Sequence, residues 1–280
     1  MPKVRAGGYD FFYQRMGQGE STVVFIHGLV MDNLSSWWYT VANQMAKHAD
    51  VICYDLRGHG LSDRPESGYQ ISDAVEDLKN ILAALDLRRP VHIVGNSYGG
   101  VVGLATASTY RDLVESLILI EAHAAVDEHS ERERNQLVHG LDLAGLLLTS
   151  DELARWLEDA AGRKMNRMAR SARTLIYDTT MVDDLRDSRP FTPTELKAID
   201  CPTLLIYGEN SDIADRGELL VNTLPRARLC VIPGVDHSVL MEATRSVRDL
   251  ITGWILDGGP ASTNGGPGVN TAGVQSGSGG

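Results

Sequence analysis

A serine stands where a predicted strand turns into a predicted helix, and this junction constrains the fold more than any other segment. The apolar run 91–94 is followed by Gly95-Asn96-Ser97-Tyr98-Gly99-Gly100 and then by 101–108, which has a helical pattern of small residues. Such a turn holds a serine hydroxyl clear of its own backbone, and it admits only small residues two positions before and after the serine. Gly95 and Gly99 meet that requirement. The segment therefore predicts that Ser97 is a nucleophile at the end of a buried strand.

Strand and helix patterns alternate along most of the chain. Runs rich in β-branched and other apolar residues predict strands at 9–16, 22–26, 51–54, 91–94, 117–120, 203–207 and 229–232. Helical patterns occupy 37–48 and 72–85, and Ser72 is the expected N-cap of the second. This alternation predicts an α/β fold with a mainly parallel sheet covered by helices on both faces.

Polar residues that suit catalysis follow three of these strands. Asp212 lies shortly after 203–207, His237 follows 229–232, and Glu121 directly follows 117–120. A histidine can take the proton of a serine hydroxyl, and a carboxylate can orient that imidazole. Either carboxylate is placed to do so.

The chain order Ser97, Asp212, His237 resembles the α/β-hydrolase family, whose catalytic residues run nucleophile, acid, histidine. His27-Gly28-Leu29 after the strand 22–26, and the segment from Asp55 to Ser62, also resemble that family. The resemblance covers roughly residues 9–123 and 196–257. It implies an α/β-hydrolase fold: an eight-stranded, mostly parallel sheet with helices on both faces and a helical cap inserted after the sixth strand.

The resemblance also implies roles for individual residues. Ser97 is the expected nucleophile, His237 the base and Asp212 the acid, with Glu121 as the alternative acid because some members of the fold carry it after the sixth strand. The backbone N–H groups of Leu29 and Tyr98 are the expected oxyanion hole.

Three further side chains are candidates for the substrate pocket: His27, Trp37 and Trp38. For His27, as for His59, the competing interpretation is a buried residue that stabilises a turn by hydrogen bonds. For the adjacent tryptophans, the competing interpretation is that one packs in the core and the other lies at the surface of a helix.

The resemblance divides the chain into four parts. Residues 1–123 form the first part of the hydrolase core, 124–195 a helical cap, 196–257 the second part of the core, and 258–280 a disordered tail rich in glycine and serine. In the cap, Met165, Met168, Ala172, Leu175 and Ile176 form an apolar face at helical spacing.

Composition excludes several classes of function. A net charge of −11 speaks against nucleic-acid binding. The chain has no run of 18 apolar residues, so we expect no membrane span. No secretory signal is evident, and the three cysteines (Cys53, Cys201 and Cys230) show no metal spacing. We therefore expect a cytoplasmic enzyme that needs no metal and no organic cofactor.

A stripe of basic residues at three- and four-residue spacing stands out in this acidic chain. It consists of Arg163, Lys164, Arg167, Arg170 and Arg173. One interpretation is a solvated helix face that pairs with nearby acidic side chains. The other is a surface that docks an acidic acyl carrier protein, or that binds a carboxylate of the substrate.

These features predict hydrolysis of an ester or thioester of a small or medium acyl substrate through an acyl-serine. A serine at position 97 argues against haloalkane dehalogenases and epoxide hydrolases, which carry an aspartate there. The motif Gly-Asn-Ser-x-Gly-Gly is similar to that of carbon–carbon bond hydrolases of aromatic degradation, although Ser238 stands where those usually carry an aromatic residue. The same motifs also suit a carrier-dependent thioesterase or cyclase, and a receptor that binds ligand without turnover.

Overall fold

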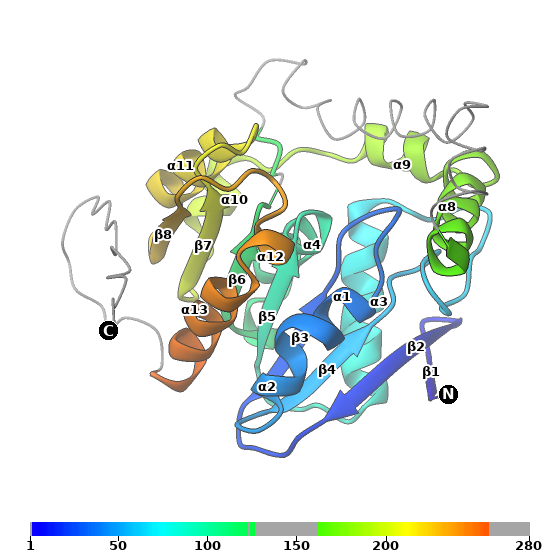
Figure 1. Cartoon of the computed structure of the whole chain (residues 1–280), viewed down its shortest axis with the longest axis horizontal. Coiled ribbons are helices and arrows are strands. Elements are labelled where there is room, and N and C mark those ends of the chain that lie inside the picture. The colour runs from blue at the N-terminus through cyan, green and yellow to red at the C-terminus, as the bar shows by residue number, and fades with distance from the viewer. Residues whose placement is uncertain (1, 123, 127–161, 258–280) are drawn as a thin grey trace, which may run out of the picture.

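The computed structural model describes residues 2–122, 124–126 and 162–257. Eight strands form one sheet in the order β1-β2-β4-β3-β5-β6-β7-β8 (Figure 1). The strands are β1 (Lys3–Ala6), β2 (Tyr9–Met16), β3 (Thr22–Ile26), β4 (Asp50–Tyr54), β5 (Val91–Asn96), β6 (Val114–Ile120), β7 (Thr203–Gly208) and β8 (Ala227–Ile232). The pairs β1–β2 and β2–β4 are antiparallel and the other pairs are parallel, which confirms the predicted sheet. Strand β1 was not predicted from the sequence.

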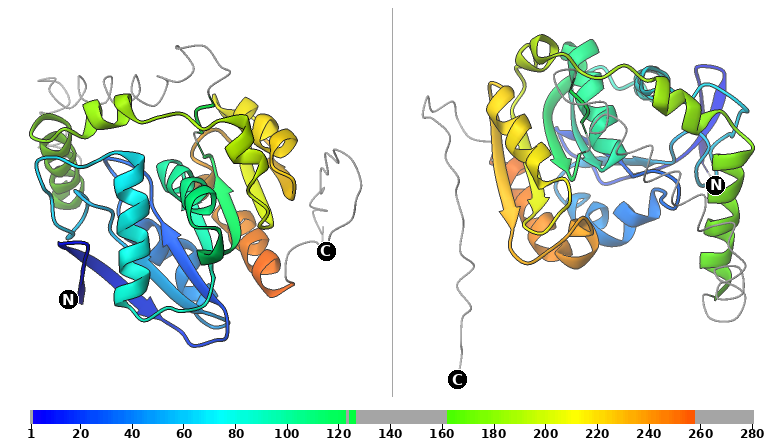
Figure 2. Two further views of the ribbon diagram at one scale, coloured as in Figure 1. Left: turned by 180° about the vertical axis from the view of Figure 1, so that it is seen from behind. Right: turned by 90° about the horizontal axis from the view of Figure 1, so that it is seen from above.

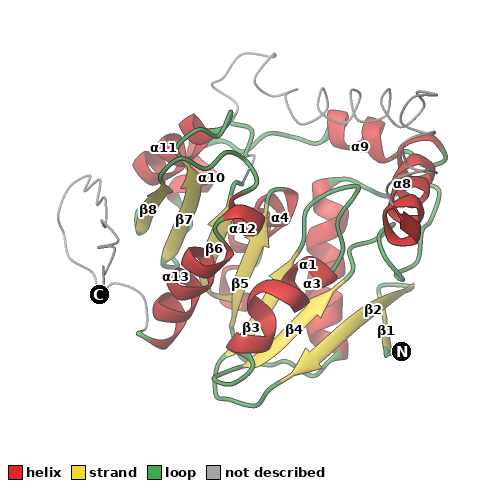
Figure 3. Ribbon diagram, viewed as in Figure 1, coloured by secondary structure: helices red, strands yellow, loops and turns green. Residues whose placement is uncertain are grey.

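Helices cover both faces of this sheet (Figures 2 and 3). Side chains of α3 (Ile71–Ala84), α4 (Tyr98–Thr109), α10 (Pro193–Lys197) and α11 (Ala214–Thr223) belong to the core of one face. The core of the other face contains side chains of α1 (Ser35–Trp37), η1 (Trp38–Ala42), α2 (Asn43–Met45), α12 (Val239–Glu242) and α13 (Thr244–Leu256).

The central strands are apolar on both sides because both sides are covered. In β3, Val24 and Ile26 belong to one core, whereas Val23 and Phe25 belong to the other. A strand buried in this way reads as a continuous apolar run rather than as an alternating one.

Two helical predictions differ in detail from the structure. Helix α3 begins at Ile71, with Gln70 in the N-cap position, and the Asp73 carboxylate accepts the Gln70 N–H at 2.9 Å. Ser72 is therefore inside the helix and is not its N-cap. The helical prediction over 37–48 corresponds to α1, the π-helical segment η1 and α2.

Two further helices of the chain between β6 and β7 pack against the segment that follows β4. They are α8 (Gly162–Tyr177) and α9 (Met181–Asp187). The Thr180 N–H donates to the Glu66 carbonyl at 2.8 Å, and the Tyr69 N–H donates to Asp184 at 2.8 Å. Much of the expected cap (127–161) and the expected tail (258–280) lie outside the described residues. None of the described helices has the length and hydropathy of a membrane span.

Candidate active site

Ser97 lies in a sharp turn between β5 and α4. Its backbone has φ 51° and ψ −115°, a conformation that residues other than glycine rarely adopt. A Cβ on Gly99 would lie 2.2 Å from the Ile26 carbonyl oxygen, and one on Gly95 would lie 2.3 Å from the Gly99 carbonyl oxygen. The turn is thus pressed against the end of β3 and against itself. This is why the positions two before and two after the serine must be glycine.

His237 is bonded to Glu121. Its Nδ1 lies 2.9 Å from Glu121 Oε2, with the imidazole 44% exposed and the carboxylate fully buried. The same carboxylate accepts hydrogen bonds from the Gly208 N–H at 2.6 Å and from the Ser211 hydroxyl at 2.5 Å. Three donors therefore stabilise a carboxylate that is out of contact with water. Glu121 also has a positive φ of 49°, so its backbone is strained at this position.

The expected acid, Asp212, does not make this contact. Its side chain is exposed, whereas the residue before it, Ser211, is buried and donates to Glu121. The reason lies in the order of the strands. The Ser97 N–H donates to the Ile120 carbonyl at 2.8 Å, so Glu121 follows the strand next to the serine strand, while Asp212 follows β7, one strand further away. The structure thus places the alternative acid, Glu121, beside His237.

The charge environment of His237 suits a base. The hydrogen bond to Glu121 raises the pKa of His237 above its ordinary value of 6.5, and the negative charges of Glu121, Asp212 and Asp236 add to the rise. Partial burial of the imidazole opposes it. Asp212 is therefore close enough to act on the histidine through its charge, but it does not orient the ring.

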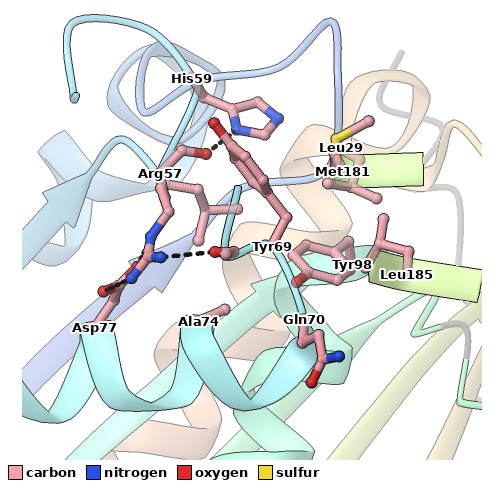
Figure 4. Close-up of a pocket in the computed structure, with 12 residues that line it drawn as sticks. Leu29, Arg57, His59, Tyr69, Gln70, Ala74, Asp77, Tyr98, Met181 and Leu185 are labelled. Atoms are coloured by element: carbon pink, nitrogen blue, oxygen red, sulfur yellow. Dashed lines mark hydrogen bonds and ion pairs between the residues drawn. The ribbon is translucent and has the colours of Figure 1, made fainter. Parts of the chain in front are cut away.

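The two expected oxyanion donors are at the correct end of the sheet. Tyr98 is the first residue of α4, so its N–H has no acceptor within that helix. Leu29 follows β3, and its side chain and that of Tyr98 line the same cavity of about 20 Å³ (Figure 4). Among the described residues, neither N–H group has a backbone acceptor. Both donors are thus available for a developing negative charge.

The aromatic residues expected at the pocket are in the core instead. Trp37 is fully buried and packs on Phe25 with ring centroids 4.9 Å apart. Trp38 is partly buried and packs against the same core. His27 is also fully buried, with both ring nitrogens bonded to the backbone of Gly28 and Leu56, which agrees with the competing interpretation of a residue that stabilises a turn. The pattern of adjacent tryptophans could not distinguish the core side of a helix from its pocket side.

The pocket beside His237 has other walls. It measures about 520 Å³ and is lined by Met31, Asp32, Asn33, Ser35, Ser36, Tyr39, Thr40, Asn96, Met168, His237, Ser238, Leu240 and Met241. An adjoining pocket of about 470 Å³ shares several of these residues and extends to Leu61, Arg167 and Ser171. Helix α8 and the loop after β3 therefore contribute to the walls of both pockets, and residues of η1 and α12 line the pocket beside His237 as well. No sequence pattern had indicated that loop beyond Leu29.

Helix α8 carries the basic stripe of the sequence. Its described members Arg167, Arg170 and Arg173 are exposed, and none forms an ion pair with another described residue. The helix buries Ala172, Leu175 and Ile176 on its opposite side, as predicted. The side chains of Arg163 and Lys164 lie outside the described part of the chain.

Other reactive groups are arranged as ordinary core or surface residues. The described residues contain no cluster of histidine, cysteine or carboxylate side chains suited to a metal ion. The thiols of Cys53, Cys201 and Cys230 are all free, and burial raises the pKa of each.

Comparison with known proteins identifies the family. Residues 21–244 match the model of the alpha/beta hydrolase fold. A 2-hydroxy-6-oxo-6-(2'-aminophenyl)hexa-2,4-dienoic acid hydrolase from Metapseudomonas resinovorans is 24% identical over 248 residues, which is 85% of each chain. A meta-cleavage product hydrolase from Pseudomonas fluorescens has a similar structure, with a TM-score of 0.70, 25% identity and coverage of 92% of this chain and 98% of that one.

An esterase from Thermogutta terrifontis also has a similar structure, with a TM-score of 0.73 and 22% identity over 92% of this chain and 99% of that one. The family model covers most of the chain, and the observed sheet agrees with that fold. The chain therefore belongs to the alpha/beta hydrolase fold family.

Proposed function

We propose that the protein is a serine hydrolase that cleaves an ester or thioester of a small or medium acyl group through an acyl-Ser97 intermediate. The observation that carries this proposal is the bond between His237 Nδ1 and the buried Glu121, at the same sheet edge as the strained Ser97 turn. Two donors besides the imidazole stabilise the charge of this buried carboxylate, and that charge in turn stabilises an imidazolium beside it.

The chemistry follows from the orientation of the imidazole. Because Nδ1–H donates to Glu121, Nε2 is left to accept a proton from the Ser97 hydroxyl as Oγ attacks the carbonyl carbon. The carbonyl oxygen becomes negative and accepts hydrogen bonds from the Leu29 and Tyr98 N–H groups. His237 then returns the proton to the leaving alkoxide or thiolate. In the second half, water gives a proton to His237 and attacks the acyl carbon. His237 then returns that proton to Ser97 Oγ as the acid is released.

The pocket supports a substrate of modest size. A cavity of about 520 Å³ is within the range that holds a small organic molecule. Its walls combine the apolar side chains of Met31, Met168 and Leu240 with hydroxyl and amide groups. An apolar acyl or alcohol group would lie against the methionines, and the polar groups would orient it.

A fluorophosphonate probe tests the proposal directly. The probe is expected to phosphonylate the wild-type protein at Ser97 and to leave a Ser97→Ala variant unlabelled. A panel of p-nitrophenyl esters and acyl thioesters of varied length then defines the substrate. Loss of the nucleophile should reduce turnover on the order of 10⁶-fold. A Ser97→Ala variant that keeps turnover within tenfold of the parent would refute the acyl-serine mechanism, and absence of labelling would favour a ligand receptor.

Hydrolysis of a carbon–carbon bond is the second candidate. Two of the relatives are named for cleavage of dienoic acids or of meta-cleavage products. The motif Gly-Asn-Ser-Tyr-Gly-Gly agrees with that group, whereas Ser238 does not. Assaying a 2-hydroxy-6-oxo-dienoate beside the ester panel distinguishes the two reactions, because the dienoate chromophore disappears on cleavage.

A further inference from the structure

The backbone N–H and C=O groups next to the Leu29 N–H are hydrogen-bonded, whereas the Leu29 N–H itself is not bonded to another described residue. The Gly28 carbonyl accepts from His27 Nδ1 at 2.6 Å, and the Gly28 N–H donates to Asp32 at 2.8 Å. On the other side, the Leu29 carbonyl accepts from the Met31 N–H at 2.9 Å, and the Val30 N–H donates to His59 Nε2 at 2.9 Å. The peptide planes on both sides of Leu29 are therefore fixed by hydrogen bonds.

These contacts determine where the Leu29 N–H points. In a trans peptide the C=O and the N–H lie in one plane and point in opposite directions. The bond from His27 to the Gly28 carbonyl therefore sets the direction of the Leu29 N–H. The bond from Val30 to His59 holds the next plane, and Val30 needs such support because its φ of +66° is unfavourable for a β-branched residue.

The two histidines are held in one tautomer each by the segment after β4. His59 is buried, and because Nε2 accepts from Val30, Nδ1 must donate to the Arg57 carbonyl at 2.9 Å. His27 accepts from the Leu56 N–H at 3.0 Å through Nε2 and donates through Nδ1. The rings lie 5.1 Å apart, and His59 lines the same cavity as Leu29 (Figure 4).

We infer that His59 is a positioning residue for catalysis. By holding the Leu29–Val30 peptide beside the plane that His27 fixes, it restricts rotation about the Leu29 backbone and keeps the Leu29 N–H aimed at the oxyanion. This inference rests on the proposed serine-hydrolase function. Burial lowers the pKa of His59 to about 3, and the neighbouring His27 adds to that effect, so the ring stays neutral and keeps its acceptor at working pH.

Two matched substitutions separate positioning from structural support. His59→Leu removes the acceptor for the Val30 N–H at similar volume, whereas the Oε1 of His59→Gln can reach the position of Nε2. His59→Asn serves if the leucine variant does not fold, because its amide can donate to the Arg57 carbonyl but is too short to accept from Val30. His92→Leu is the control, since His92 is partly buried, bonds Ser116 at 2.8 Å and lies at the opposite end of β5 from Ser97.

The measurements are kcat and KM for a p-nitrophenyl ester, and inhibition constants for an alkyl trifluoromethyl ketone and the corresponding alcohol. The ketone forms a hemiketal on Ser97 whose oxyanion occupies the site of the developing charge, whereas the alcohol has no such atom. We expect His59→Leu to lower kcat by about 10- to 100-fold with little change in KM, since removing an oxyanion donor outright costs about 10²–10³. Ketone affinity should fall by the same factor, and alcohol affinity should not change.

Recovery of most of this loss by His59→Gln, with normal kcat in His92→Leu, supports the inference. A His59→Leu or His59→Asn variant that melts at a lower temperature but keeps its kcat and ketone affinity overturns it, because His59 would then support only the fold. Wild-type protein that forms no ketone adduct and takes no fluorophosphonate would overturn the serine-hydrolase proposal, and this inference with it.

Discussion

Replacing Glu121 by glutamine should nearly abolish turnover, whereas replacing Asp212 by asparagine should not. In the structure, Glu121 Oε2 receives both the Ser211 hydroxyl and His237 Nδ1, while Oε1 receives the Gly208 N–H. The amide oxygen of a glutamine would stay on Gly208, because the backbone N–H can only donate. Its NH₂ group would then face His237.

This geometry turns the histidine into the wrong tautomer. An NH₂ group can only donate, so Nδ1 must lose its proton and Nε2 must carry it. His237 then has no lone pair for the Ser97 proton. A misset tautomer of a triad histidine costs about 10⁴ in kcat, and at about 1.4 kcal/mol per tenfold this amounts to roughly 5.5 kcal/mol.

Asp212→Asn is the matched control. It makes the same change of carboxylate to amide at an exposed side chain that acts on His237 only through its charge. A loss of less than tenfold is expected, because an exposed charge is screened by water and salt. The assay is the burst and steady-state rate with a p-nitrophenyl ester, with fluorophosphonate labelling rate as a second readout. If Asp212→Asn loses about 10⁴ and Glu121→Gln does not, the acid is Asp212 and the assignment of Glu121 is wrong.

Four further outcomes follow from the same contacts. The pH–rate profile of kcat/KM should fall on the acidic side through a pKa above 6.5, because protonated His237 cannot accept a proton and its pKa is raised. Gly99→Ala should lower stability by roughly 1–3 kcal/mol or more and reduce labelling of the serine, as judged by urea unfolding and probe kinetics, because its Cβ would overlap the end of β3. Asp77→Asn should cost about 3–5 kcal/mol in the same unfolding assay, since it removes the counter-charge of the mostly buried Arg57 guanidinium, which bonds Asp77 at 2.5 and 2.9 Å. If α8 docks an acidic acyl carrier protein, Arg167→Glu should slow hydrolysis of a carrier-bound acyl chain in a salt-dependent manner and leave a p-nitrophenyl ester unaffected, whereas equal effects on both substrates would point to the pocket wall instead.

The sequence by itself determined the architecture and the serine. A continuous apolar run has few alternatives to a buried parallel strand when helical patterns flank it, and this was enough to predict the sheet. The glycines on either side of Ser97 are a local requirement of a crowded turn, so the turn could be predicted from the residues alone. His237 was predicted from its place shortly after the last strand together with the resemblance to the family.

The acid depended on the tertiary structure. Glu121 and Asp212 both follow predicted strands. No local pattern states which of the two the loop that carries His237 will contact. The strand order places β6, and not β7, next to the serine strand. The loop after β8 bonds the loop after β7, with the Asn210 N–H donating to the Val235 carbonyl at 2.9 Å, and reaches Glu121 through His237. Only this long-range arrangement brings His237 onto Glu121.

The same distinction explains the aromatic residues and the oxyanion loop. Trp37 is in the core because α1 packs its ring on Phe25 of β3, and no local pattern states that these two segments meet. His59 supports Leu29 through one hydrogen bond, which the N–H of the next residue, Val30, donates to the His59 ring. Leu29 and His59 are thirty positions apart in the sequence. Periodicity records which residues are apolar, but the partner of a buried polar atom is decided only when distant segments pack together.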